Sequence, residues 1–158
     1  MNQPKVLTCL WFDGEGEDAA RLYTSLVPGS EITGTLGKTA AGGPLMVTFT
    51  LAGTPYQALN GGPQFKLDEA ASIVVTTDDQ GETDRLWDAL TDGGREGRCG
   101  WLVDRFGVSW QIVPRALPAL LGGPDPDGAR RAMEAMLQMH KIDIAALEAA
   151  YGGGETSG

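Results

Sequence analysis

The feature that most constrains the fold of this chain is an internal repeat. A shift of 64 positions carries residues 21–29 onto residues 85–93, with Arg, Leu and Gly recurring at matching places. A shift of 54 positions carries residues 53–57 onto residues 107–111, with Gly and Gln recurring. The two matches keep the same order and lie beside matching turns, which indicates a duplicated βαβββ module whose second copy is shorter.

Each copy starts with an apolar strand followed by an amphipathic helix. Residues 6–12 form a short apolar run, and residues 15–27 place apolar side chains at helical spacing before a Pro-Gly stop. In the second copy, residues 72–76 predict the strand and residues 79–91 predict the helix. The other strands of the first copy are expected at residues 31–37, 45–51 and 55–59, and a loop follows over residues 60–70.

Residues 99–114 predict a β-hairpin. Its turn is expected at residues 104–107, where the Asp104 side chain can bond to the backbone and a Gly permits positive φ. Because successive side chains of a strand point to opposite faces, Trp110 and Ile112 are expected on a packing face. The opposite face is expected to carry Ser109, Gln111 and Val113.

The composition changes after Pro114 and favours helices. Helical segments are expected at residues 115–121, 127–140 and 143–152, the last with Asp143 as its N-cap. The Met side chains of the middle segment predict a core face, a cover over a ligand groove or a contact with a partner subunit. We therefore expect paired modules within residues 1–114 (about 5–60 and 71–114), a helical extension over 115–151 and a disordered tail over 152–158.

Charge and cysteine usage narrow the class of protein. The net charge of −9, from 21 acidic and 12 basic residues, disfavours nucleic acid and an anionic membrane surface as partners. It either keeps the protein soluble or favours a cationic small molecule. Cys9 and Cys99 show no metal or disulfide pattern, and no apolar run is long enough to span a membrane. We expect a cytoplasmic protein with reduced cysteines.

Three segments carry a resemblance to a known family: CLWFDGEGEDAARLYTSLVPGS, YQALNGGP and CGWLVDRFGVSWQIVP. With them, and with the terminal AMLQMHKIDIAALEAAY, the chain resembles the PhnB-like branch of the vicinal oxygen chelate superfamily. The resemblance implies an α+β fold in which two βαβββ modules form a curved mixed sheet around a central cavity. Members of this branch are often labelled 3-demethylubiquinone-9 3-methyltransferase domains, and related folds serve as glyoxalases, extradiol dioxygenases, fosfomycin-modifying enzymes and bleomycin-sequestering proteins.

The resemblance also implies where metal ligands would stand. In metal-dependent members the ligands come from the first and last strands of each module, which here are the positions of Thr8, Gln57, Ser72 and Gln111. A transition metal prefers imidazole or carboxylate donors, whereas these hydroxyl and amide groups carry no charge. We therefore predict no tightly bound catalytic metal and no cofactor.

The same four side chains are candidates for ligand binding. Strand parity predicts that they share a mostly apolar pocket with Leu10, Phe12, Leu59, Val74 and Val113. The alternative is that Gln57 and Gln111 hydrogen-bond each other across a filled core. Aromatic side chains expected on helix-facing positions are Trp11, Tyr56, Trp87 and Trp110, whereas the register of Trp101 stays open.

Other catalytic chemistries have little support in the sequence. The spacing Gly14-x-Gly16-x-x-Ala19 imitates a dinucleotide fingerprint, but acidic residues in that loop would repel a pyrophosphate. His140 is the only histidine and has no evident nucleophile beside it. The sequence favours a binding protein for a small hydrophobic or cationic molecule, and the resemblance implies a homodimer, in which the Met-bearing helical extension could take part. The alternative is an enzyme: a lyase, isomerase, dioxygenase or the methyltransferase of the family label.

Overall fold

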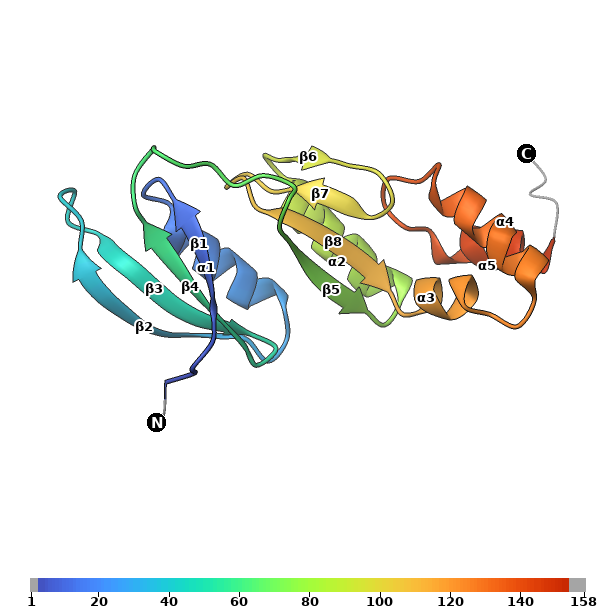
Figure 1. Cartoon of the computed structure of the whole chain (residues 1–158), viewed down its shortest axis with the longest axis horizontal. Coiled ribbons are helices and arrows are strands. Elements are labelled where there is room, and N and C mark those ends of the chain that lie inside the picture. Colours follow the sequence, from blue (N-terminus) through green and yellow to red (C-terminus); the bar gives the residue numbers. More distant parts are fainter. Residues whose placement is uncertain (1–2, 154–158) are drawn as a thin grey trace. The chain divides into compact units, whose positions relative to one another are not determined.

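The computed structural model describes residues 3–153, which form two units that divide between Leu67 and Asp68 (Figure 1). Each unit holds one βαβββ module with a four-stranded mixed sheet of its own, which confirms the predicted α+β fold. The helical extension after Pro114 belongs to the second unit. Within residues 3–153, no helix is long and apolar enough to cross a membrane.

The N-terminal unit has one helix packed on one face of its sheet. Its sheet order is β1-β4-β3-β2, in which β1 runs parallel to β4 and the other pairs are antiparallel. Ala19, Ala20 and Tyr23 of the helix are fully buried together with Val47 and Ala58 of the sheet. The elements are β1 (Thr8–Phe12), α1 (Gly16–Leu26), β2 (Glu31–Lys38), β3 (Pro44–Leu51) and β4 (Thr54–Asn60).

The C-terminal unit repeats this arrangement with shorter strands. Its sheet order is β5-β8-β7-β6, with β5 parallel to β8. Asp79 caps the helix by accepting from the Glu82 amide at 2.8 Å, and Leu86 and Leu90 are buried on its inner side. The elements are β5 (Ser72–Thr77), α2 (Gln80–Thr91), β6 (Arg95–Glu96), β7 (Trp101–Val103) and β8 (Ser109–Pro114).

The predicted hairpin is formed by β7 and β8, and Asp104 builds its turn. The Asp104 carboxylate accepts from the amides of Phe106 at 2.9 Å and Val108 at 3.0 Å. Its second oxygen accepts from the Trp110 indole at 2.9 Å. The carboxylate is therefore buried with its acceptor positions used, as a buried charge requires. The predicted role of Asp104 in the turn is confirmed.

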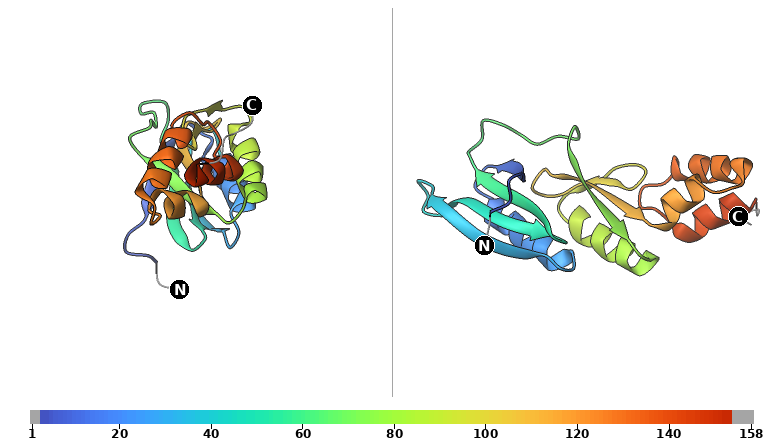
Figure 2. Two further views of the ribbon diagram at one scale, coloured as in Figure 1. Left: turned by 90° about the vertical axis from the view of Figure 1, so that its right-hand side faces the viewer. Right: turned by 60° about the horizontal axis from the view of Figure 1, so that its bottom comes forward.

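Three helices follow β8 and gather beyond its end (Figure 2). They are α3 (Ala116–Leu121), α4 (Pro126–Met136) and α5 (Ile144–Gly152), and they share a small core of Leu117, Ile142 and Leu147. Gln80 of α2 ties the extension to the sheet unit. Its amide nitrogen donates to the Ile142 carbonyl, and its oxygen accepts from the Ile144 amide.

The middle helix ends earlier than the predicted residues 127–140. The carbonyls of Met139 and His140 accept from the amides of Cys99 and Gly100, both at 2.8 Å. These tertiary bonds draw the segment after Met136 out of helical geometry. At the other end of the extension, Gly152 closes α5 and Gly153 caps it at φ 74, so they do not belong to a disordered tail. Residues 154–158, where the rest of the tail was predicted, lie outside the described residues.

Candidate functional site

Each sheet has one face covered by its helix and one face without a helix, called here the open face. Paired residues of neighbouring strands share a face, so the register assigns each side chain. In the N-terminal sheet, Ala58 pairs with Leu10 and Val47 in the core against α1. Gln57 pairs with Cys9 and Thr48 and therefore lies on the open face. Leu59 lies on that face too.

The prediction that the first strand turns Thr8, Leu10 and Phe12 to the same face as Gln57 is wrong. Leu10 and Phe12 are buried on the α1 side, and Thr8 has the same parity, whereas Cys9 and Trp11 face the same way as Gln57. Three residues connect β1 to α1 but only two connect β5 to α2. The shift of 64 that aligns the helices therefore misaligns the strands by one residue. A slip of one residue turns every side chain of a strand to the other face.

Trp11 is thus on the open face and not on the helix side. Its indole nitrogen donates to the Gly62 carbonyl at 2.8 Å, and its ring meets Phe65 edge to face with centroids 4.9 Å apart. A Cβ on Gly61 would overlap the Trp11 ring, so only glycine fits there. The loop after β4 is therefore fixed by an aromatic contact on the open face.

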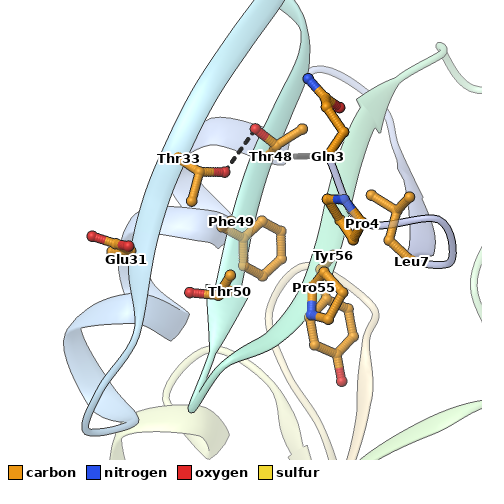
Figure 3. Close-up of a pocket in the computed structure, with 10 residues that line it drawn as sticks. All are labelled: Gln3, Pro4, Leu7, Glu31, Thr33, Thr48, Phe49, Thr50, Pro55 and Tyr56. Atoms are coloured by element: carbon orange, nitrogen blue, oxygen red, sulfur yellow. Dashed lines mark hydrogen bonds between the residues drawn. The ribbon is translucent and has the colours of Figure 1, made fainter. Parts of the chain in front are cut away.

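The N-terminal unit contains a hollow of about 360 Å³ beside the start of β4 (Figure 3). Thr33 donates to Thr48 at 2.9 Å, and Thr48 is the register partner of Gln57. Glu31 is the one charged residue of the lining. The lining consists of Gln3, Pro4, Leu7, Glu31, Thr33, Thr48, Phe49, Thr50, Pro55 and Tyr56.

The chemistry of the hollow is mostly apolar with hydroxyl groups. Burial raises the pKa of the Tyr56 phenol, so this hydroxyl stays protonated and can donate over the physiological range. Phe49 stacks on Tyr56 with ring centroids 5.4 Å apart. None of the predicted site residues lines this hollow. It depends on Gln3, Pro4 and Leu7, which precede the first strand and carry no periodic signal.

The open face of the C-terminal sheet follows the predicted parity. Ser72 pairs with Ser109, and Val74 pairs with Gln111, so these four side chains share one face. The next register pair on the same face is Thr76 with Val113. The Gln111 amide nitrogen donates to the Ser72 hydroxyl at 3.0 Å. Val74 is 55% exposed. The predicted group Ser72, Val74, Gln111 and Val113 is therefore on one face, and within this unit the amide nitrogen of Gln111 donates to Ser72.

Two residues of this face were not predicted as part of the site. Trp101, whose register the sequence left open, pairs with Gln111 across the hairpin and so lies on the open face. Ser109 is 1% exposed, and its hydroxyl has no hydrogen-bond partner among residues 3–153. The alternation of Ser109 with Gln111 in β8 was a sufficient signal for its position. Its burial has no signal in the sequence.

The donor set does not fit a chelated divalent metal. With the corrected alignment, Leu7 is the counterpart of Ser72, because β1 maps onto β5 with a shift of 65. Gln57, Ser72 and Gln111 remain as neutral donors, and two of them are bonded to each other. The part of the chain that the structure describes holds no group of three or more His, Cys, Asp or Glu side chains able to bind a metal ion.

Cys99 and His140 lie at the junction between the hairpin and the extension. Cys99 has a left-handed φ of 58, and its amide bonds the Met139 carbonyl. His140 Nδ1 lies 2.8 Å from the Gly97 carbonyl oxygen. Both residues therefore hold the loop between β6 and β7 against the extension. Cys9 and Cys99 are free thiols.

Comparisons with known proteins agree with this fold. The family model described as 3-demethylubiquinone-9 3-methyltransferase matches residues 4–113, so α3, α4 and α5 lie beyond the match. The PhnB protein of Bacillus cereus is 29% identical, with a TM-score of 0.65 over 70% of this chain and 99% of its own. No curated protein matches the chain.

Two more distant structures show the fold alone. A protein of Pseudomonas aeruginosa is 20% identical, with a TM-score of 0.60 over 71% of this chain and 98% of its own. A mutant of the fosfomycin resistance protein FosX of Listeria monocytogenes, complexed with Mn(II) and 1S,2S-dihydroxypropylphosphonic acid, is 14% identical. Its TM-score is 0.51 over 72% of this chain and 93% of its own.

Proposed function

Because the chain belongs to the PhnB-like family described as 3-demethylubiquinone-9 3-methyltransferase, in the vicinal oxygen chelate superfamily, we propose that it binds a small molecule without a tightly held metal ion. The observation that carries the proposal is the hollow of about 360 Å³ in the N-terminal unit. Its size falls within the range of small-molecule sites, and its lining combines apolar surface with a few hydroxyl groups.

The charges of the protein favour a hydrophobic or cationic ligand. Glu31 is the only charged residue of the lining, and the whole chain carries a net charge of −9. A carboxylate at the hollow would repel an anion and attract an ammonium group. Thr33, Thr48 and the protonated Tyr56 supply neutral hydrogen bonds that orient a polar substituent.

A thermal-shift screen of metabolites and antibiotics tests this proposal. The screen is run with and without Mn, Ni, Zn, Fe and S-adenosylmethionine, alongside metal analysis of untagged protein. We expect a ligand to raise the melting temperature without added metal. The Thr48→Val variant should bind that ligand with lower affinity. Thr35→Val, on β2 but outside the hollow, serves as the matched control. A near-stoichiometric transition metal in purified protein would reject the proposal.

An enzyme is the second candidate function, because the family description names a methyltransferase. Gly14-x-Gly16-x-x-Ala19 joins β1 to α1, but Glu15, Glu17 and Asp18 occupy this segment. Negative charge at a helix N-terminus complements the dipole and opposes a bound phosphate. A thermal shift with S-adenosylmethionine alone, or with metal alone, would favour the enzyme over the binding protein.

The oligomeric state is a separate part of the proposal. Met133 and Leu137 are exposed on the helical extension, and apolar side chains of this kind commonly meet a partner subunit. A homodimer is proposed on this basis. Light scattering at micromolar concentration should give twice the mass of the 16.6 kDa chain, and a monomer mass would remove the proposal.

A further inference from the structure

The strand β2 forms one edge of the N-terminal sheet. It pairs with β3 on one side, and no strand within residues 3–153 pairs with its other side. A bare edge carries a row of backbone N–H and C=O groups that can pair with another strand. The corresponding edge of the C-terminal sheet, β6, is only two residues long, whereas β2 has eight residues. One unit has therefore a shortened edge, and the other offers a full-length edge for pairing.

Exposed apolar side chains stand on both faces of this edge. Leu36 is 66% exposed, and Ile32 is 37% exposed. Leu36 pairs with Met46 on the open face of the sheet. Ile32 pairs with Phe49 on the covered face. A second strand laid beside β2 would remove both side chains from water, which favours association.

The charged residues of β2 stand at its two ends and have opposite signs. Glu31 is the first residue of the strand and Lys38 is the last, and both are exposed. Neither forms an ion pair within the described residues. Their partners in β3 are Thr50 and Pro44, so both charged side chains lie on the open face.

An antiparallel second copy of β2 brings these charges together. In a two-fold antiparallel pair, one residue lies opposite itself and the others pair symmetrically about it, each pair on one face. We place the axis at Thr35 and count residues 33 and 34 of the β-bulge as one position. Glu31 then lies opposite the partner's Lys38. An axis one position away would place Leu36 or Ala40 opposite Glu31, so only the axis at Thr35 pairs the charges.

The same register places each large side chain opposite a glycine. Leu36 lies opposite the partner's Gly34 on the open face, and Ile32 lies opposite the partner's Gly37 on the covered face. Glycine has no side chain, so Leu36 and Ile32 can lie across the partner strand without a clash. Charge and size therefore select one and the same register.

We propose that β2 pairs with β2 of a second copy of this chain in an antiparallel two-fold contact, which joins two four-stranded N-terminal sheets into one continuous sheet. This inference rests on the homodimer proposed above and places its contact at β2, so the helical extension becomes the competing surface. Glu31 also lines the hollow, where the partner's Lys38 would compete with a cationic ligand.

Charge reversal tests the contact by analytical ultracentrifugation over a concentration series at low salt. Lys38→Glu and Glu31→Lys each place like charges opposite each other twice in the dimer, so each should weaken self-association about 10-fold. An equimolar mixture of the two variants restores both attractions and should associate as tightly as wild type. Lys66→Glu, which makes the same charge change at an exposed lysine outside β2, is the matched control and should associate like wild type.

The outcomes separate this inference from the proposals on which it rests. Unchanged self-association in both β2 variants, or a mixture no tighter than the single variants, would overturn it. A dimer that is lost in Leu137→Glu but kept in Lys38→Glu would also overturn it, because the contact would then lie on the extension and the homodimer would stand. A monomer at all concentrations would remove both. The small-molecule function fails separately, when purified protein carries near-stoichiometric metal.

Discussion

Buried polar groups on the covered faces of both sheets are hydrogen-bonded, whereas Ser109 on the open face of the C-terminal sheet has no partner within the described residues. On the covered face of the N-terminal sheet, Asn60 accepts from the Gly16 amide at 2.8 Å and donates to the Pro44 carbonyl at 2.9 Å. On the covered face of the C-terminal sheet, Thr77 and Thr83 bond each other. On the open face, Ser109 is equally buried and has no partner within the described residues. The named polar groups under the helices are thus hydrogen-bonded, whereas a buried hydroxyl on the open face of the C-terminal sheet has an unused hydrogen bond.

The largest effect is expected where a covered-face group serves several donors. In Asp104→Ala, three donors from Phe106, Val108 and Trp110 lose a buried carboxylate. We expect the free energy of unfolding in urea to fall by about 3–5 kcal/mol, because bonds to a charged group are strong and the donors stay buried. Asp88→Ala, which removes an exposed acid of α2, is the control. A loss no larger than that of the control would contradict the comparison.

Asn60 tests the same rule in the N-terminal unit. Asn60→Ala leaves the Gly16 amide and the Pro44 carbonyl without their side-chain partners, so we expect a loss of about 2–3 kcal/mol in urea unfolding. Asn60→Asp keeps an acceptor for Gly16 but sets a buried carboxylate against the Pro44 carbonyl oxygen, so at pH 7 it should be no more stable than Asn60→Ala. A loss in Asn60→Ala no larger than that in the exposed control Asp88→Ala would contradict the prediction.

Thr77→Val tests the comparison most directly, because it removes a hydroxyl that is as fully buried as that of Ser109 but lies on the covered face. We expect a loss of about 1 kcal/mol in urea unfolding, since Thr83 keeps its bond to the Asp79 carbonyl and only one hydroxyl pair is lost. Ser109→Ala removes a buried hydroxyl that has no partner within the described residues, so we expect it to raise the free energy of unfolding. If both variants shift the unfolding midpoint in the same direction, the two faces do not differ in the way described.

Most of the fold could be predicted because its signals are local. The helices at residues 15–27 and 79–91, the β7–β8 turn at Asp104 and the Asp143 cap all depend on spacing and side-chain chemistry within a few residues. The end of α4 could not be predicted. It depends on bonds from Cys99 and Gly100 to carbonyls some 40 residues later in the chain.

The strand faces were predicted better in one unit than in the other, for one physical reason. Ser72, Val74 and Gln111 share a face as expected. Leu10 and Phe12 do not join Gln57, because one extra residue before α1 changes the strand alignment without changing the helix alignment. The alternation of side chains along a strand assigns each one to the correct face only when the strand register is known to within one residue. The hollow near Leu7 could not be predicted, because part of its lining comes from an irregular segment whose side chains do not alternate between two faces.

The smallest effect is expected where water reaches both partners, as between α2 and the extension. Lys141 lies 2.8 Å from Asp84, and the side chains are 36% and 42% exposed, so the pair should contribute less than about 1 kcal/mol. The hydrogen bond from Lys141, aided by Gln80, lowers the pKa of Asp84, and the bond to Asp84 raises the pKa of Lys141. A lowered carboxyl pKa gives stability that is present above the ordinary value of 3.8 and is lost as the pH falls through the folded pKa. A raised ammonium pKa gives stability that is present below the ordinary 10.5 and is lost as the pH rises through the folded pKa.

The variant Lys141→Met should therefore unfold at slightly lower urea than wild type at pH 7 and low salt, because the exposed pair is lost. The difference should shrink as the pH falls below the ordinary 3.8 and through the lowered pKa of Asp84, and in 1 M NaCl, where exposed charges are screened. Lys66→Met, which removes an exposed lysine of the other unit, is the control. A difference that is the same at low salt and in 1 M NaCl would mean that Lys141 acts through its aliphatic packing. In that case Lys141→Met would not report the contribution of an exposed ion pair. The losses of unfolding free energy in Asp104→Ala and Asn60→Ala would then be compared only with that in Asp88→Ala.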